Sequence, residues 1–231
     1  MSGAAESGAA SGGAASGRAA SGRVASGGAA SGRAASGRVA SGGAAKAGPA
    51  KNDGPMAVLI GPPGSGKSTV GSVLAGLLGV AFRDTDDDVE KAAGKPVADI
   101  FVQDGEPAFR TLERQAVAAA VHEHRGVLAL GGGAVLDPQA QRLLGGQAVV
   151  YLETGLAALA HRNGLDRPRP LLIGNPRAQL KALLAERLPV YQSLATWTVP
   201  TDDYAPEEIA DEIAAKIAAA SAAHGSNGPR G

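Results

Sequence analysis

The chain has 231 residues, a formal net charge of zero at pH 7 and no cysteine. The missing thiol excludes disulfides, zinc–thiolate sites and cysteine nucleophiles, and it makes a reducing cytoplasm the expected location. The balanced charge gives no sign of nucleic-acid or membrane-surface binding. The sequence also lacks a run of about twenty apolar residues, so no membrane span is expected.

The N-terminal segment is a repeat of small residues. Residues 11–25 read SGGAASGRAASGRVA, and residues 26–40 repeat them letter for letter. A chain of this composition cannot bury a core and lacks the apolar run of a signal peptide, so we expect a disordered tail over 1–54. Its sparse arginines leave weak binding to an anionic partner as the alternative. One domain is expected over 55–220, followed by a flexible tail at 221–231.

The core alternates short apolar runs with helical patterns. Strands are expected at 57–60, 80–82, 127–130, 148–153 and 197–199, and helices at 70–79, 97–103, 105–124, 156–161, 176–195 and 206–220. This alternation predicts an α/β fold with a mainly parallel sheet covered on both faces. Ligands of such sheets bind beyond the carboxyl ends of the strands, so the residues that follow each strand are the candidate site.

The first strand is followed by GPPGSGKST, residues 61–69, which matches the phosphate-binding pattern G-x-x-x-x-G-K-[ST]. Glycines let successive backbone N–H groups point at phosphate oxygens, and the start of the next helix adds a favourable dipole. Lys67 would reach the outer phosphates, and the Ser68 hydroxyl would ligate Mg²⁺. The sequence therefore predicts a site for a nucleoside triphosphate, with a merely structural turn as the weaker alternative.

The stretch RDTDDD places four carboxylates within residues 84–88. If the chain is extended there, Asp84 and Asp86 face the same way and can project toward one site. Asp87 and Asp88 are expected to start the next helix, where carboxylates meet free N–H groups.

Three further groups follow later strands and can bind a phosphoryl acceptor. A mixture of arginines and carboxylates would suit an acceptor that has both hydroxyls and a carboxylate. The glycines would permit close approach of backbone to a ligand. The groups are Arg110 with Glu113 and Arg114, the glycines 131–133, and Arg162, Arg167, Arg169 and Arg187. A solvated helical ion-pair set is the alternative for the first group.

The motifs GPPGSGKST, DTD, DGEPAFRTLE, LGGGAV, RPLL and ERLPVY occur in this order, and together they resemble shikimate kinase over residues 56–220. The resemblance implies ATP-dependent phosphorylation of the shikimate 3-hydroxyl, on the route to chorismate and the aromatic amino acids. It also implies a monomer with the three-layer P-loop kinase fold, a central five-stranded mainly parallel sheet and a mobile lid.

On the nucleotide side, the resemblance implies that the lid residue Arg169 meets the transferring phosphoryl group and that Arg162 lies near the adenine. One Mg²⁺ ion would bind with ATP at Ser68 and Asp84. The implied phosphate-binding residues are Gly64, Ser65, Gly66, Lys67, Ser68 and Thr69.

On the acceptor side, Asp86 would accept hydrogen bonds from shikimate hydroxyls and orient or deprotonate the 3-hydroxyl. Arg110 and Arg187 would pair with the shikimate carboxylate. Backbone N–H groups would come from Gly131, Gly132 and Gly133, Gly132 above all. The implied catalytic residues are Lys67, Asp86 and Arg169.

Two positions depart from the family pattern. Arg167 and Pro168 crowd the lid beside Arg169, and Tyr204 stands where an adenine-side arginine is expected. The alternatives are a related small-molecule kinase, such as gluconate kinase, and a nucleotide-binding module that has lost catalysis. The first would not be expected to combine DTD, GGG and RPLL, and the intact Lys67, Asp86 and Arg169 disfavour the second.

Overall fold

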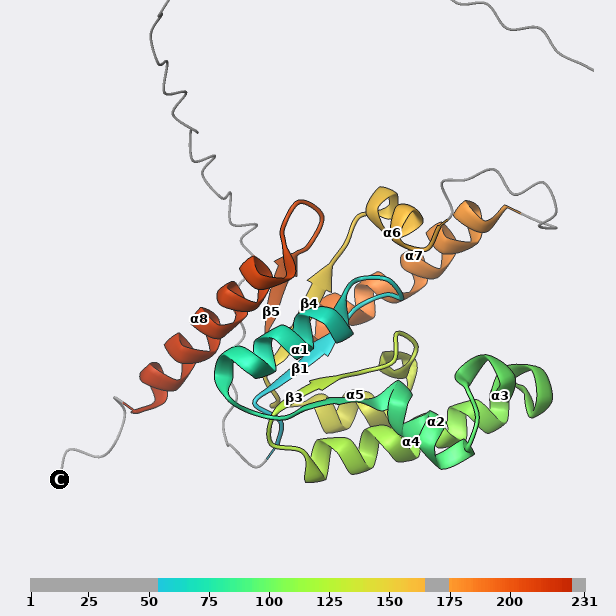
Figure 1. The fold of residues 1–231 in the computed structure, drawn as a ribbon, viewed down its shortest axis with the longest axis horizontal. Coiled ribbons are helices and arrows are strands. Elements are labelled where there is room, and N and C mark those ends of the chain that lie inside the picture. The colour runs from blue at the N-terminus through green and yellow to red at the C-terminus, as the bar shows by residue number, and fades with distance from the viewer. Residues whose placement is uncertain (1–53, 165–174, 226–231) are drawn as a thin grey trace, which may run out of the picture. The chain divides into compact units, whose positions relative to one another are not determined.

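The computed structural model describes residues 54–164 and 175–225. Within them, five strands form one parallel sheet in the order β2-β3-β1-β4-β5 (Figure 1). The strands are β1 (Ala57–Ile60), β2 (Phe82–Asp84), β3 (Val127–Ala129), β4 (Val149–Glu153) and β5 (Trp197–Pro200). The helices are α1 (Lys67–Leu78), α2 (Thr85–Ala93), α3 (Val97–Gln103), α4 (Gly105–Glu123), α5 (Pro138–Leu144), α6 (Leu156–Arg162), α7 (Pro176–Leu194) and α8 (Pro206–Gly225), with a short 3₁₀ helix at Ala134–Leu136. The expected α/β class and five-stranded sheet are confirmed.

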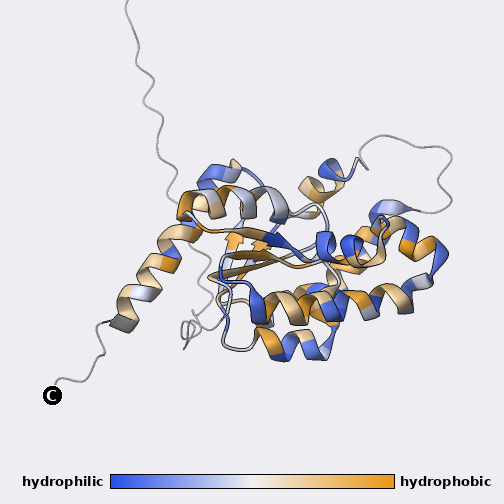
Figure 2. Cartoon of the chain, turned by 60° about the horizontal axis from the view of Figure 1, so that its bottom comes forward, coloured by the Kyte–Doolittle hydropathy of each residue, from blue (hydrophilic) through white to orange (hydrophobic). Residues whose placement is uncertain are grey.

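The central strand β1 is buried on both faces of the sheet. Successive strand residues point to opposite faces. Val58 and Ile60 therefore join a core with residues of α4, α5 and α7, whereas Ala57 and Leu59 join a second core with residues of α1 and α8. Figure 2 shows the strands mainly in the hydrophobic colour, while the helices carry both colours. This double burial explains why the strands read as short continuous apolar runs.

Helices α2, α3 and α4 pack around a small core of their own beside the sheet (Figure 1). Its buried residues are Val89, Ile100 and Phe109. Arg83 of β2 ties this lobe to the sheet, because its Nε donates to Asp88 Oδ2 at 2.7 Å and its Nη1 to Glu123 Oε2 at 3.1 Å. The first turn of α2 is thereby held at the carboxyl end of β2.

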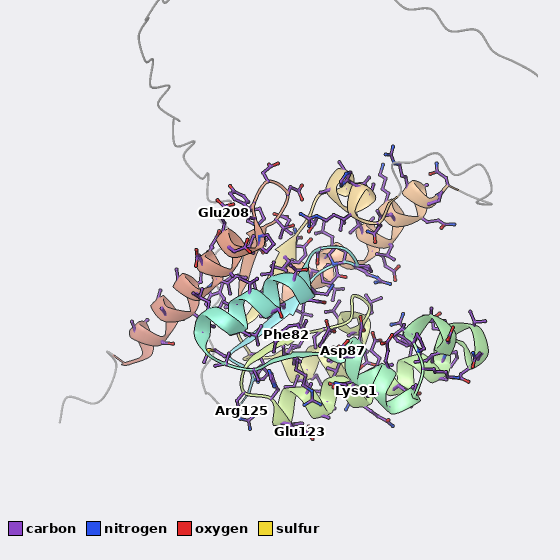
Figure 3. All side chains as sticks on the ribbon, in the orientation of Figure 1. Phe82, Asp87, Lys91, Glu123, Arg125 and Glu208 are labelled. Atoms are coloured by element: carbon purple, nitrogen blue, oxygen red, sulfur yellow. The ribbon has the colours of Figure 1, made fainter. Side chains whose placement is uncertain are left out.

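The largest difference from the expected elements lies at residues 80–93. The second strand covers 82–84 rather than 80–82, and the helix begins at Thr85 rather than near Asp87. Asp84 causes this abrupt change, because its side chain accepts a hydrogen bond from the Asp86 N–H and caps α2. Asp87 lies exposed on α2 with Lys91 one turn further along the helix (Figure 3).

The other helix and strand boundaries differ less from the expected ones. Helix α1 begins at Lys67 rather than residue 70, and α8 continues to Gly225 rather than ending at 220. Helix α5, which was not expected, has Asp137 as its N-cap and Pro138 in its first turn. In residues 54–164 and 175–225, no helix is long and apolar enough to cross a membrane. Residues 1–53 of the tail expected over 1–54, and the lid residues Arg167 to Leu172, fall outside the described residues.

Candidate active site

The loop between β1 and α1 forms a cradle at the carboxyl end of the central strand. Gly64 and Gly66 have φ values of 82° and 93°, a left-handed conformation that favours glycine. Gly66 is the N-cap of α1, so the unpaired N–H groups at the start of this helix border the loop. This geometry suits an anion, and it lies where the sequence predicted phosphate binding.

Ser65 fills the inside of this cradle. Its N–H donates to the Pro62 carbonyl at 3.1 Å, and its hydroxyl is buried without a hydrogen-bond partner in the described part of the chain. A Cβ at Gly61 would lie 2.8 Å from that hydroxyl, so only glycine fits beside it. Ser65 shapes the loop in this structure, and its direct contact with phosphate stays a prediction.

Lys67 crosses the cradle. Its Nζ donates to the carbonyls of Gly61 at 3.0 Å and Pro62 at 3.1 Å. Burial of the ammonium group lowers the pKa of Lys67 to about 8, although the nearby Asp86 and Asp84 act to raise it. A phosphate beside Lys67 would supply further negative charge and favour the protonated form. Lys67 is thus placed to compensate the charge of a bound phosphate.

Ser68 and Asp84 form an oxygen pair beside the cradle. The Ser68 Oγ donates to Asp84 Oδ2 at 2.7 Å, and Asp84 Oδ1 accepts from the Asp86 N–H at 3.0 Å. The described residues contain no cluster of three or more His, Cys, Asp or Glu that could hold a metal by itself. A hydroxyl with one carboxylate fits the way Mg²⁺ binds beside phosphates, where water and phosphate oxygens supply the remaining ligands.

Asp86 lies in the first turn of α2, so the expectation of an extended Asp84–Asp86 segment is wrong. The two carboxylates nevertheless face one region, because both are close enough to Lys67 to raise its pKa. A Cβ at Gly131 would lie 2.5 Å from Asp86 Oδ1. Burial, then repulsion by Asp84, raise the pKa of Asp86 to about 6, while Lys67 opposes the shift. A carboxylate with this pKa can accept a proton from a hydroxyl near neutral pH.

Replacing Asp86 by asparagine is expected to stabilise the unliganded protein above pH 6. The folded protein retains the Asp86 proton up to about pH 6, whereas the unfolded chain releases it near pH 4. The contribution of the Asp86 carboxyl to the free energy of unfolding therefore falls as the pH rises from about 4 to about 6, and it stays low at higher pH. The gain from asparagine should be about 3 kcal/mol at pH 8 and near zero at pH 4.

Urea unfolding at pH 4.5 and pH 8 measures this difference. Asp87→Asn is the matched control, because Asp87 is exposed on the same helix turn. A gain that is the same at both pH values, or a loss at pH 8, would contradict the assigned effect of burial.

Arg110 of α4 is held by two carboxylates on its own helix. Its Nη1 donates to Glu113 Oε2 at 2.7 Å, and its Nη2 to Glu106 Oε1 at 3.0 Å. Glu113 is only 4% exposed, so this ion pair is not the solvated set considered as an alternative. Arg114 lies apart, with its Nη1 3.8 Å from Asp137 Oδ2. Arg110 is the member of this group that reaches the site, since a Cβ at Gly133 would lie 2.5 Å from its Nη1.

The glycines that follow β3 connect the two halves of the site. A Cβ at Gly132 would lie 2.9 Å from Pro63 Cδ in the phosphate cradle. The Gly131 N–H donates to Thr85 Oγ1 at 3.0 Å, and the Gly132 carbonyl accepts from the Tyr191 hydroxyl at 2.6 Å. Gly131 is thus not available as the ligand N–H donor that the sequence predicted. The N–H groups of Gly132 and Gly133 have no partner among the described residues.

The remaining described arginines of the predicted site come from α6 and α7. Arg187 on α7 has a buried Nε without a partner in the described residues, and its charge acts on Lys67 and Tyr191. Arg162, at the end of α6, donates through Nη2 to the Thr201 carbonyl at 2.8 Å. Its Nη1 lies 3.5 Å from the carbonyls of Gly64 and Ser65. Arg167 and Arg169 lie outside the described residues.

Tyr204 follows β5 and packs against the core formed with α1 and α8. It also lines a pocket of about 500 Å³, together with Tyr151, Leu184, Leu188 and Asp202. Thr85, Tyr191 and Thr201 were not identified as site residues from the sequence. Thr85 lies within the motif DTD and Tyr191 within ERLPVY, so their places in these motifs could have identified them as site residues.

Comparisons with known proteins agree with this geometry. The family model described as shikimate kinase matches residues 63–218. A shikimate kinase of Thermobifida fusca is 61% identical over 72% of this chain and 96% of its own, and one of Saccharopolyspora erythraea is 57% identical over 73% and 97%. The structure of a shikimate kinase from Acinetobacter baumannii in complex with shikimate is similar with a TM-score of 0.66 and 36% identity, over 72% of this chain and 93% of that one.

Proposed function

The chain belongs to the shikimate kinase family, and from this premise we propose that it transfers the γ-phosphoryl group of ATP to the 3-hydroxyl of shikimate. The products are shikimate 3-phosphate and ADP, and the reaction serves the biosynthesis of chorismate and the aromatic amino acids. The observation that carries the proposal is the approach of Gly132 to Pro63, which joins the acceptor loop to the phosphate cradle.

On the nucleotide side, the cradle of residues 64–69 binds the ATP phosphates. Lys67 neutralises their charge, and the transition state of phosphoryl transfer needs such positioned charge more than covalent help. Arg162, which already lies over the cradle loop, extends toward the adenine. Arg169 completes the charge stabilisation from the lid segment.

Mg²⁺, when bound with ATP, neutralises phosphate charge and orients the γ-phosphoryl group. Ser68 and Asp84 would hold one such ion, because their oxygens already lie together beside the cradle. Ser68→Ala is expected to raise the Mg²⁺ concentration for half-maximal rate about tenfold, as one ligand is lost. Ser193→Ala, on the exposed surface of α7, is the control. Full activity of the wild type in excess EDTA would exclude this ion.

On the acceptor side, Asp86 accepts hydrogen bonds from the shikimate hydroxyls, and its raised pKa fits it to take the 3-hydroxyl proton. Arg110 and Arg187 clamp the carboxylate of shikimate, since a guanidinium fork matches a carboxylate. The N–H groups of Gly132 and Gly133, which have no partner among the described residues, add hydrogen bonds to the same ligand. Gly131 serves by its small size, which lets Asp86 approach.

The enzyme is further proposed to act as a cytoplasmic monomer whose activity lies within residues 55–220. Comparing the shikimate-dependent rate of ADP release of the full-length protein with that of a variant lacking residues 1–54 tests whether the N-terminal segment is needed for activity. Equal rates are expected, and a large loss of rate would assign a role to the N-terminal repeat.

A coupled assay of ADP release with several acceptors tests the function. Shikimate should support turnover, whereas gluconate and nucleoside monophosphates should not, because they lack the carboxylate and hydroxyl arrangement that Arg110, Arg187 and Asp86 would bind. Turnover with gluconate alone would defeat the proposal.

A further inference from the structure

The glycine loop after β3 is held by two buried hydroxyls that come from opposite sides. Thr85 Oγ1 accepts from the Gly131 N–H at 3.0 Å, and the Tyr191 hydroxyl donates to the Gly132 carbonyl at 2.6 Å. Both side chains have 0% exposure. Neither touches the phosphate cradle through a hydrogen bond in the described residues. Their common partner is the backbone of the loop.

The contact with Tyr191 determines where the next N–H group points. The peptide between Gly132 and Gly133 is planar, so its C=O and N–H point in opposite directions. Glycine accepts both signs of φ, and consecutive glycines do not fix this peptide by their own conformational preference. With its carbonyl held by Tyr191, the peptide directs the Gly133 N–H away from Tyr191. That N–H has no partner among the described residues.

Gly133 lies beside Arg110, one of the two proposed carboxylate-binding arginines. A Cβ at Gly133 would lie 2.5 Å from Arg110 Nη1, so Gly133 is packed against that guanidinium. Arg187 stands one helical turn before Tyr191 on α7. Burial raises the pKa of the Tyr191 hydroxyl, while the charge of Arg187 and its hydrogen bond to that hydroxyl act to lower it. Helix α7 thus carries both a proposed carboxylate ligand and the residue that orients the loop.

We propose that Tyr191 is a positioning residue for shikimate, which aims the Gly133 N–H at the acceptor carboxylate between Arg110 and Arg187. This role rests on the proposed function, because it requires shikimate to be the ligand. Thr85 assists from α2 by holding the preceding residue, Gly131. Tyr191 acts without touching the substrate, through the Gly132–Gly133 peptide and through the hydrogen bond of its hydroxyl with the Arg187 side chain.

Tyr191→Phe keeps the ring and its stacking on Tyr151, whose centroid is 5.2 Å away, and removes only the hydroxyl. The KM for shikimate should rise about tenfold, which is the loss expected for one hydrogen bond to a charged group. The kcat and the KM for ATP should stay within about twofold, because the interaction is the same in ground and transition states.

Tyr151→Phe is the matched control. It removes the hydroxyl of the other ring in the same stacked pair, which does not contact the glycine loop, and should leave all three constants within about twofold. Thr85→Val tests the second hydroxyl, and Thr85→Ser should restore the wild-type KM for shikimate. A valine variant that loses shikimate affinity without serine rescue would reduce Thr85 to a packing role and overturn its part of the proposal.

The wild-type assay distinguishes a failure of the proposed function from a failure of the positioning role of Tyr191. If the wild type turns over shikimate and Tyr191→Phe has an unchanged KM for it, the positioning role is wrong and the function stands. An equal rise in the KM for ATP would also overturn it, because it would indicate general damage to the site. If the wild type shows no shikimate-dependent ADP release, the proposed function fails, and the role of Tyr191 fails with it.

Discussion

Asp86→Asn is expected to lower kcat by about 10²- to 10⁴-fold, the range found when a positioned general base is removed. Asparagine keeps the size of the side chain and can still hydrogen-bond a hydroxyl, but it cannot take the 3-hydroxyl proton. The Kd for ATP should change by no more than about twofold, because Asp86 belongs to the proposed acceptor side and not to the cradle of residues 64–69.

The pH dependence of the wild type provides an independent check on Asp86. At concentrations of both substrates well below their KM values, the rate reports groups of the free enzyme. Because the pKa of Asp86 is about 6, the rate should fall as pH drops through 6, where the carboxylate becomes protonated. The Asp86→Asn variant should lose this acid limb. An undiminished rate in that variant would refute the role of Asp86 as a base.

Lys67→Met is expected to lower kcat/KM for ATP by about 10²- to 10³-fold, similar to the loss of one preorganised charge-stabilising group. Methionine has a similar length and no charge, so the cradle should keep its shape. The unliganded variant should be at least as stable as the wild type, because burial disfavours the Lys67 ammonium in the folded protein. Activity would thus be lost without loss of folding.

Steady-state kinetics with varied ATP and thermal unfolding measure the two parts of this prediction. Lys91→Met is the control, because Lys91 is exposed in the last turn of α2 and is not part of the cradle loop (Figure 3). If Lys67→Met retained most of its kcat/KM for ATP, the assignment of the phosphate cradle would be in error. If it lost both activity and stability, the effect could be assigned to misfolding instead.

The phosphate cradle was predictable because its information is local. The spacing of glycines, Lys67 and Ser68 between a strand and a helix specifies one loop geometry, and the structure contains it. The parallel sheet was predictable for the same kind of reason, since buried strands read as short apolar runs between helical patterns. The shikimate kinase family followed from several motifs in order and was confirmed.

The parts that could not be predicted depend on contacts between distant residues. Thr85 and Gly131 are 46 positions apart, and Tyr191 and Gly132 are 59 apart. No local pattern shows that the Gly131 N–H donates to Thr85 within the protein, so the sequence could not separate Gly131 from Gly132 and Gly133 as a ligand donor. The direction of Asp86 was derived from an extended backbone, but the side chain of Asp84 caps a helix at that point and turns the chain.

The position of phosphate in the product of the wild-type enzyme tests the central claim most directly. Phosphorus-31 and proton NMR of the product made from ATP and shikimate should show one new phosphate ester, on the 3-hydroxyl, in an amount equal to the ADP released. ADP formed without phosphorylated shikimate, or phosphate on another hydroxyl, would contradict the placement of the acceptor between Asp86 and the arginine pair.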